Sequence, residues 1–169
     1  GLSQAIVRRS YAQLKSVSNH LRAYDPSPVA RFQPKILDGN HLAGTEHRLL
    51  ETRGTTAAPL PGKTLVVLDP RREAIADLFP IEDGHAQERS GLDAVIETIE
   101  AGDLWIADRN FCTLKFLYAI ARKCGRLVIR LHDKMKGEQL GSRRYCGKTA
   151  SGRVYEYQLK LTEYEGHTL

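Results

Sequence analysis

A short apolar run that ends on an acidic residue constrains the fold of this chain more than any other feature. Leu104 to Ala107 are consecutive apolar residues, the pattern of a strand buried on both faces, and Asp108 follows directly. A carboxylate at the end of a buried strand is costly unless an arginine, backbone N–H groups or a metal ion compensates it. Asn110 and Thr113 can cap a helix that follows, so the stretch predicts strand, acidic residue, turn and helix. Alternatively, Asp108 serves only as a helix cap.

A second copy of this arrangement lies earlier in the chain. The run Lys35 to Leu37 leads into Asp38, and Gly39 allows a backbone or a ligand to approach closely. Asp38 and Asp108 can meet only if their strands are neighbours. Adjacent carboxylates repel one another, and a divalent cation such as Mg²⁺, which prefers carboxylate oxygens, relieves that repulsion.

The composition bounds the class of protein. The chain has 169 residues, of which 41% are hydrophobic, enough for a core and too many for a disordered chain. Its formal charge of +5 suits a phosphate-rich partner. No apolar stretch reaches the length of a membrane span or of a signal peptide. The odd number of cysteines, with no CxxC pair, indicates a reducing compartment and argues against a zinc site.

The expected elements follow one another in a simple order. Residues 3–24 have helical periodicity, with two alternatives for this helix: packing on the core through its apolar face, or contacting DNA through its basic face. A stiff linker follows, and the next elements alternate in type. We expect strands at 35–38, 64–68, 74–79, 104–107 and 126–131, with helices at 86–100 and from about 110 to 123.

This β-β-β-α-β-α-β order matches the ribonuclease-H-like pattern, a mixed α/β sheet in which the first strand lies beside the fourth and strands two and three form a hairpin. The expected domains are an N-terminal helix and linker at 1–30, the ribonuclease-H-like core at 31–132, and the beginning of a basic, β-rich segment at 133–169.

The tail of the chain is basic. Residues 134–153 are rich in lysine, arginine and glycine, and residues 154–162 alternate as an exposed strand would. Basic residues interleaved with tyrosines suit a nucleic-acid backbone, and a solvated loop is the equal alternative. The residues concerned are Lys134, Lys136, Arg143, Arg144, Lys148, Arg153, Tyr145, Tyr155 and Tyr157.

Other motifs are weaker indications of a functional site. Gly62-Lys63-Thr64 imitates the end of a phosphate-binding loop, but the required earlier glycine is replaced by Ala57, so we reject it. His41 can lie near a bound metal or phosphate, although an ordinary polar role is the simpler interpretation. His85 can line a site from the start of the following helix.

At the two aspartates the sequence resembles a known family. The stretches Ile36 to Leu42 and Trp105 to Phe111 look like the first and second acidic motifs of DDE transposases of bacterial insertion sequences. The similar branch has a third motif that reads Tyr-x2-Arg-x3-Glu-x6-Lys. The resemblance covers about residues 32–132. It implies a ribonuclease-H-like fold, DNA strand cleavage and transfer, and Asp38 and Asp108 as catalytic, metal-binding carboxylates for Mg²⁺, with Mn²⁺ as a substitute.

The resemblance also implies partners. These are double-stranded DNA at transposon ends and at the target, and a second copy in a homodimer of the intact enzyme, in the cytoplasm of a bacterium near the nucleoid. Phosphates would be held by residues beside the aspartates and by the tail: Arg109, Asn40, His41, Lys134, Lys136, Arg143 and Arg144.

The third motif of the family does not occur in this sequence. We therefore expect a transposase domain that is incomplete at its C-terminus, with 134–169 as the start of a β-rich insertion and the glutamate beyond Leu169. Two alternatives stay open: a non-catalytic DNA-binding remnant, and a hydrolytic nuclease of the same fold.

Overall fold

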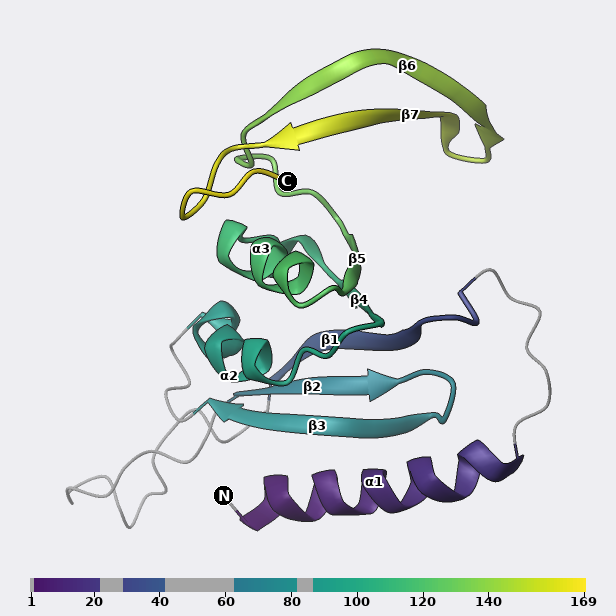
Figure 1. The fold of residues 1–169 in the computed structure, drawn as a ribbon, viewed down its shortest axis with the longest axis vertical. Helices are drawn as coiled ribbons and strands as arrows, with labels where there is room; N and C mark the ends of the chain where they lie inside the picture. Colours follow the sequence, from purple (N-terminus) through teal and green to yellow (C-terminus); the bar gives the residue numbers. More distant parts are fainter. Residues whose placement is uncertain (1, 22–28, 42–62, 82–86) are drawn as a thin grey trace. The chain divides into compact units, whose positions relative to one another are not determined.

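The computed structural model describes four stretches of the chain, residues 2–21, 29–41, 63–81 and 87–169 (Figure 1). The side chains of residues 2, 3, 18–21 and 41 are outside this description. The chain divides into two compact units, Gly1–Arg130 and Leu131–Leu169. Each unit is described by itself below.

A mixed five-stranded sheet forms the centre of the first unit, in the order β3-β2-β1-β4-β5. The pairs β1–β2 and β2–β3 are antiparallel, whereas β1–β4 and β4–β5 are parallel. The predicted order of strands along the chain, the hairpin of the second and third strands and the pairing of the first strand with the fourth are therefore confirmed. The strands are β1 (Gln33–His41), β2 (Lys63–Asp69), β3 (Ala74–Ile81), β4 (Asp103–Ala107) and β5 (Arg126–Ile129).

The helices of this unit are mostly short. They are α1 (Leu2–Leu21), η2 (Glu88–Gly91), α2 (Leu92–Glu97), η3 (Arg109–Phe111) and α3 (Leu114–Arg122), where η denotes a 3-10 turn. The expected single helix over 86–100 is wrong, because the described part begins as a 3-10 turn and the α-helix ends at Glu97. Ser90 and Gly91 are weak helix formers, which explains the break at their position.

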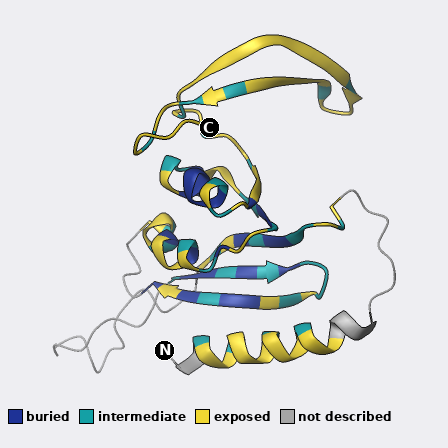
Figure 2. Cartoon of the chain, viewed as in Figure 1, coloured by how far each residue is buried: buried dark blue, intermediate teal, exposed yellow. Residues whose placement is uncertain are grey.

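The core lies on one face of the sheet. Alternate residues of the central strands, such as Leu37, Val67 and Trp105, point to this face and pack against apolar side chains of α2 and α3. The rings of Trp105 and Phe116 meet edge to face at 5.9 Å between centroids. Each large apolar side chain buried here contributes about 1.5–3 kcal/mol. Figure 2 marks the middle of α3 and many positions of β2 and β3 as buried.

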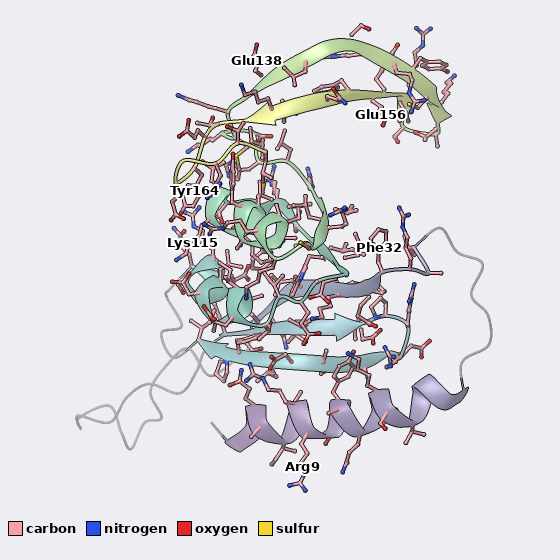
Figure 3. All side chains as sticks on the ribbon, in the orientation of Figure 1. Arg9, Phe32, Lys115, Glu138, Glu156 and Tyr164 are labelled. Carbon is pink, nitrogen blue, oxygen red and sulfur yellow. The ribbon has the colours of Figure 1, made fainter. Side chains whose placement is uncertain are left out.

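Helix α1 packs against β3 and makes polar contacts with β3 and with the end of β2. Tyr11 Oη donates a hydrogen bond to Asp69 Oδ2 at 2.8 Å, and Arg8 Nε donates to Asp77 Oδ2 at 2.8 Å. The guanidinium of Arg8 also lies over the ring of Phe79, 5.6 Å from its centroid. Arg9, by contrast, points away from the sheet in Figure 3. The helix therefore packs on the sheet, as one of the two alternatives expected, but not through its apolar face alone. Arg8 belongs to the predicted basic face, whereas Leu14 and Val17 of the predicted apolar face are exposed.

The second unit is a long antiparallel ribbon of β6 (Gly137–Thr149) and β7 (Gly152–Leu161). The exposed strand expected over 154–162 corresponds to β7, which begins two residues earlier and ends at Leu161. The alternative of a solvated loop for the basic segment is wrong over 137–149, where backbone pairing with β7 forms a strand. None of the described helices is long and apolar enough to cross a membrane.

Candidate functional site

Asp38 and Asp108 lie at the same edge of the sheet because their strands are paired in register. Leu37 pairs with Ala107 in the parallel β1–β4 ladder, and each is followed by an aspartate. The backbone of Asp108 is still extended, with φ −74° and ψ 166°, so the alternation of β4 continues through it. Side chains alternate along a strand, so both carboxylates project to the face opposite Leu37. This is the neighbouring arrangement that the sequence predicted.

Both carboxylates are exposed to solvent. Because water solvates them, they do not need the compensating partner that a buried carboxylate requires. Asp38 Oδ1 accepts a hydrogen bond from the Gly39 backbone N–H at 2.8 Å. Asp108 precedes η3 but makes no capping hydrogen bond with its side chain. The cap of α3 is Thr113, whose Oγ1 accepts from the Phe116 N–H at 3.3 Å. The alternative that Asp108 is only a helix cap is therefore wrong.

Glu88, a residue that the sequence analysis missed, lies beside the two acidic motifs. Gly39 leaves space for it, because a β-carbon at position 39 would collide with the Glu88 carboxylate. Asn110 Nδ2 donates a hydrogen bond to Glu88 Oε2 at 2.7 Å. Glu88 therefore joins the residue after Asp38 to a residue of the second motif. Nothing in its local sequence distinguishes it, since the contact depends on three distant segments.

Glu88 approaches from the other side of the sheet. The direction of a β-carbon at Gly39 is the direction of Leu37, toward the core, whereas Asp38 points the opposite way. In agreement, the part of the chain that the structure describes contains no group of three or more His, Cys, Asp or Glu side chains able to hold a metal. The candidate metal ligands are thus Asp38 and Asp108. Their oxygens are the donors that Mg²⁺ prefers, with water completing the coordination shell.

The structure describes the side chains of only some of the other residues predicted beside the aspartates. Asn40 is exposed in β1, and Arg109 is exposed directly after Asp108. His41 is the last residue of β1, but its side chain is outside the described residues, as is the whole of His85. Arg109 and Asn40 therefore lie at the same edge of the sheet as the aspartates, as expected from the motifs.

The phosphate-binding residues predicted in the tail belong to the second unit. Two of them, Arg143 and Arg144, have different partners there. Arg143 lies over the ring of Tyr157, with its Cζ 5.2 Å from the centroid. Arg144 instead makes an ion pair with Glu156. The hydrogen bond and charge of Arg144 hold the pKa of the Glu156 carboxyl below its ordinary value. Neighbours in sequence thus have different electrostatic surroundings.

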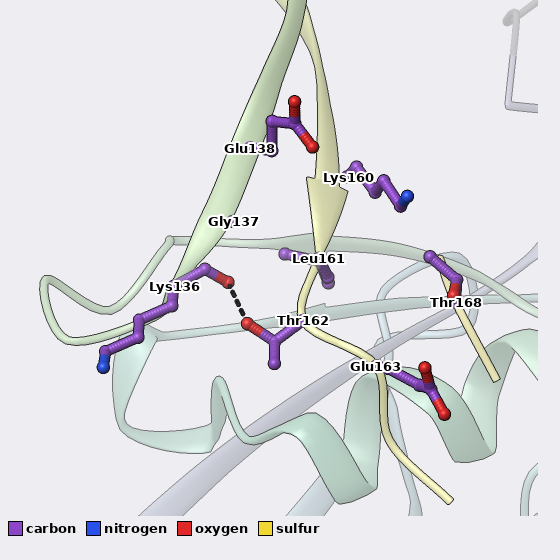
Figure 4. A pocket seen from close by; sticks show the side chains of 8 residues that line it. All are labelled: Lys136, Gly137, Glu138, Lys160, Leu161, Thr162, Glu163 and Thr168. Atoms are coloured by element: carbon purple, nitrogen blue, oxygen red, sulfur yellow. Dashed lines mark hydrogen bonds between the residues drawn. The ribbon is translucent and has the colours of Figure 1, made fainter. Parts of the chain in front are cut away.

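A hollow of about 450 Å³ lies at the base of the ribbon (Figure 4). Thr162 Oγ1 donates a hydrogen bond to the backbone oxygen of Lys136 at 3.1 Å along its edge. Lys136 and Lys160 line it together with Glu138 and Glu163. The charges balance, so this hollow has no preference for an anion such as phosphate.

No model of a known protein family matches the chain, and no curated protein matches its sequence.

Proposed function

We propose that this chain supplies two metal-binding carboxylates of the catalytic domain of a metal-dependent DNA transposase with a ribonuclease-H-like fold, and that the intact enzyme cleaves and transfers DNA strands. The observation that carries the proposal is the pairing of Leu37 with Ala107, which brings Asp38 and Asp108 to one edge of a mixed sheet. Two acidic residues at the ends of adjacent parallel strands suit a shared divalent cation. The order and pairing of the strands, β3-β2-β1-β4-β5, support the fold assignment.

In this proposal the chain supplies binding and orientation. Asp38 and Asp108 would hold Mg²⁺ or Mn²⁺, which would supply stabilisation of the negative charge on a phosphate undergoing cleavage. The exposed Arg109, directly after Asp108, is positioned to neutralise a neighbouring phosphate. Asn110 orients Glu88 beside Gly39. Double-stranded DNA is the proposed substrate, with charge attraction as the sequence-independent part of its binding.

The proposal is tested by titrating the full chain with Mn²⁺ and Mg²⁺ in a calorimeter. Asp38→Asn and Asp108→Asn each remove one anionic ligand, and we expect either to weaken binding on the order of tenfold or more. Asp93→Asn is the matched control, because Asp93 is an exposed carboxylate of α2 that pairs with Lys115 and does not belong to either acidic motif. Equal affinity of all three variants and the parent chain for the ion would refute the metal site.

A second assay separates the proposed activity from its alternatives. The chain is supplied with DNA ends, with and without a target duplex, and products are resolved on a gel. Joined products indicate strand transfer, and cleavage alone indicates a hydrolytic nuclease. If Asp38 and Asp108 are the only metal ligands, the chain should bind metal without cleaving DNA. DNA binding without metal affinity would indicate a DNA-binding remnant.

A further inference from the structure

The two faces of the β6–β7 ribbon have different chemistry. The register pairs Tyr145 with Tyr155 and Lys148 with Arg153, and alternation along β7 places Tyr157 on the same face. Arg143 belongs to this face as well, since its guanidinium lies over the Tyr157 ring. We call this set the tyrosine face: Arg143, Tyr145, Lys148, Arg153, Tyr155 and Tyr157.

The opposite face is electrically balanced. Arg144 and Glu156 are register partners there and form an ion pair, and Glu138 is the partner of Lys160. The tyrosine face, in contrast, contains three cationic residues and no carboxylate within the two strands. The excess positive charge of the ribbon is therefore on the side that carries the aromatic rings, which suits a polyanion.

The rings of this face are exposed, and two of them are in contact. Tyr145, Tyr155 and Tyr157 have 56%, 46% and 41% of their surface exposed. Tyr145 and Tyr155 meet edge to face with centroids 5.5 Å apart, which restricts both rings. An exposed, partly ordered set of aromatic rings between cations is the arrangement that binds unpaired bases, because each base stacks on a ring while its phosphate meets a cation.

We propose that the tyrosine face binds single-stranded nucleic acid, with the tyrosines stacking on bases and Arg143, Lys148 and Arg153 neutralising phosphates. The inference rests on the proposed function only in taking nucleic acid as the partner. It goes further by selecting one face of the ribbon and unpaired bases. In a duplex the flat faces of the bases are covered by their neighbours, so a duplex could use the cations of this face but not its rings.

The test is fluorescence anisotropy of a labelled oligothymidylate of about 20 nucleotides, long enough for a single-strand site, against a duplex of the same length. The protein is the full 169-residue chain at fixed salt. We expect the single strand to bind more tightly than the duplex. Arg143→Gln should weaken single-strand binding more than Arg144→Gln, although both remove one positive charge from adjacent positions.

Aromatic variants separate stacking from charge. Tyr155→Leu and Tyr157→Leu keep apolar bulk but remove the ring, and each should weaken single-strand binding about tenfold. Tyr155→Phe and Tyr157→Phe keep the ring and should bind as the parent chain does, which also verifies that the ribbon tolerates substitution. Duplex affinity should change little in all four variants.

Three results would overturn the inference. They are duplex binding as tight as single-strand binding, equal losses in Arg143→Gln and Arg144→Gln, and leucine variants that bind like the parent. Self-association that is lost in Tyr155→Leu, with no single-strand binding, would assign the face to a second copy instead. The metal titration of Asp38 and Asp108 does not depend on the ribbon. Loss of the single-strand binding result therefore leaves the proposed metal site standing, and a failed metal titration leaves the proposed role of the tyrosine face standing.

Discussion

Leu37 and Ala107 are register partners in adjacent parallel strands, and an aspartate follows each of them. A slip of one residue between β1 and β4 would turn one aspartate to the opposite face, because side chains alternate along a strand. The same slip would move either Leu37 or Trp105 out of the core, where 1% and 0% of their surfaces are exposed. Burial of these two side chains on one face thus holds the register that places the two carboxylates side by side.

We expect the 169-residue chain to bind one divalent ion but not to nick DNA. Cleavage by two metal ions needs them about 3.5–4 Å apart, and two carboxylates do not balance the second charge. The measurement is conversion of supercoiled to open-circular plasmid with Mg²⁺ or Mn²⁺. Nicking by the parent chain that is lost in Asp38→Asn and Asp108→Asn would mean that a third ligand is present and would contradict the prediction.

Replacing Lys35 by methionine should destabilise the first unit by about 3 kcal/mol, because it leaves a buried charge without its partner. Lys35 Nζ lies 2.8 Å from Asp103 Oδ2, and both side chains are largely buried. Lys115→Met is the control, since Lys115 pairs with Asp93 at an exposed site and should cost less than about 1 kcal/mol. Urea unfolding followed by Trp105 fluorescence measures both, and equal losses would contradict the prediction.

The attachment of α1 should depend on pH through Asp69. Burial raises the pKa of the Asp69 carboxyl, but hydrogen bonds from Arg72, Tyr11 and the Arg71 backbone outweigh it, so the pKa lies below its ordinary value. A lowered pKa in the folded state contributes stability above the unfolded pKa, at about pH 4, and this is lost as pH falls through the folded value. The free energy of unfolding should therefore fall less steeply with acid in Asp69→Asn than in the parent chain.

Alkaline pH should act on the same contact through Tyr11. Burial, followed by the hydrogen bond and charge of Asp69, raises the pKa of the Tyr11 hydroxyl above its ordinary value. Its contribution to stability is complete below about pH 10 and is lost as pH rises toward the folded pKa. Tyr11→Phe should cost about 1–2 kcal/mol at neutral pH and remove this alkaline dependence, which unfolding curves at several pH values will measure.

Duplex DNA should bind weakly and with a steep dependence on salt. Neutralising Lys134, Lys136, Arg143 and Arg144 together should flatten the slope of log affinity against log salt, since fewer counterions are released. Anisotropy of a labelled duplex at several salt concentrations measures the slope. An unchanged slope would remove the ribbon from the duplex-binding surface.

Local patterns in the sequence were sufficient for the order of elements and for both acidic motifs. The apolar runs before Asp38 and Asp108 predict strands because burial requires such runs. Of the two predicted helix caps, Thr113 is confirmed because its hydroxyl accepts from a nearby backbone N–H, whereas the Asn110 side chain donates to Glu88. The single helix expected over 86–100 is interrupted at Ser90 and Gly91, which lie in a 3-10 turn. Both residues have weak helix propensity, but the prediction gave more weight to the apolar periodicity.

Only the tertiary structure decides which distant residues meet. Glu88 reaches Gly39 and Asn110, and Tyr11 reaches Asp69, across separations that no local pattern encodes. The separation of Arg143 from Arg144 likewise depends on the pairing of β6 with β7, including its register shifts. The physical reason is that propensity and apolar periodicity act within one element, whereas ion pairs and hydrogen bonds between elements form only after the sheet has set their positions.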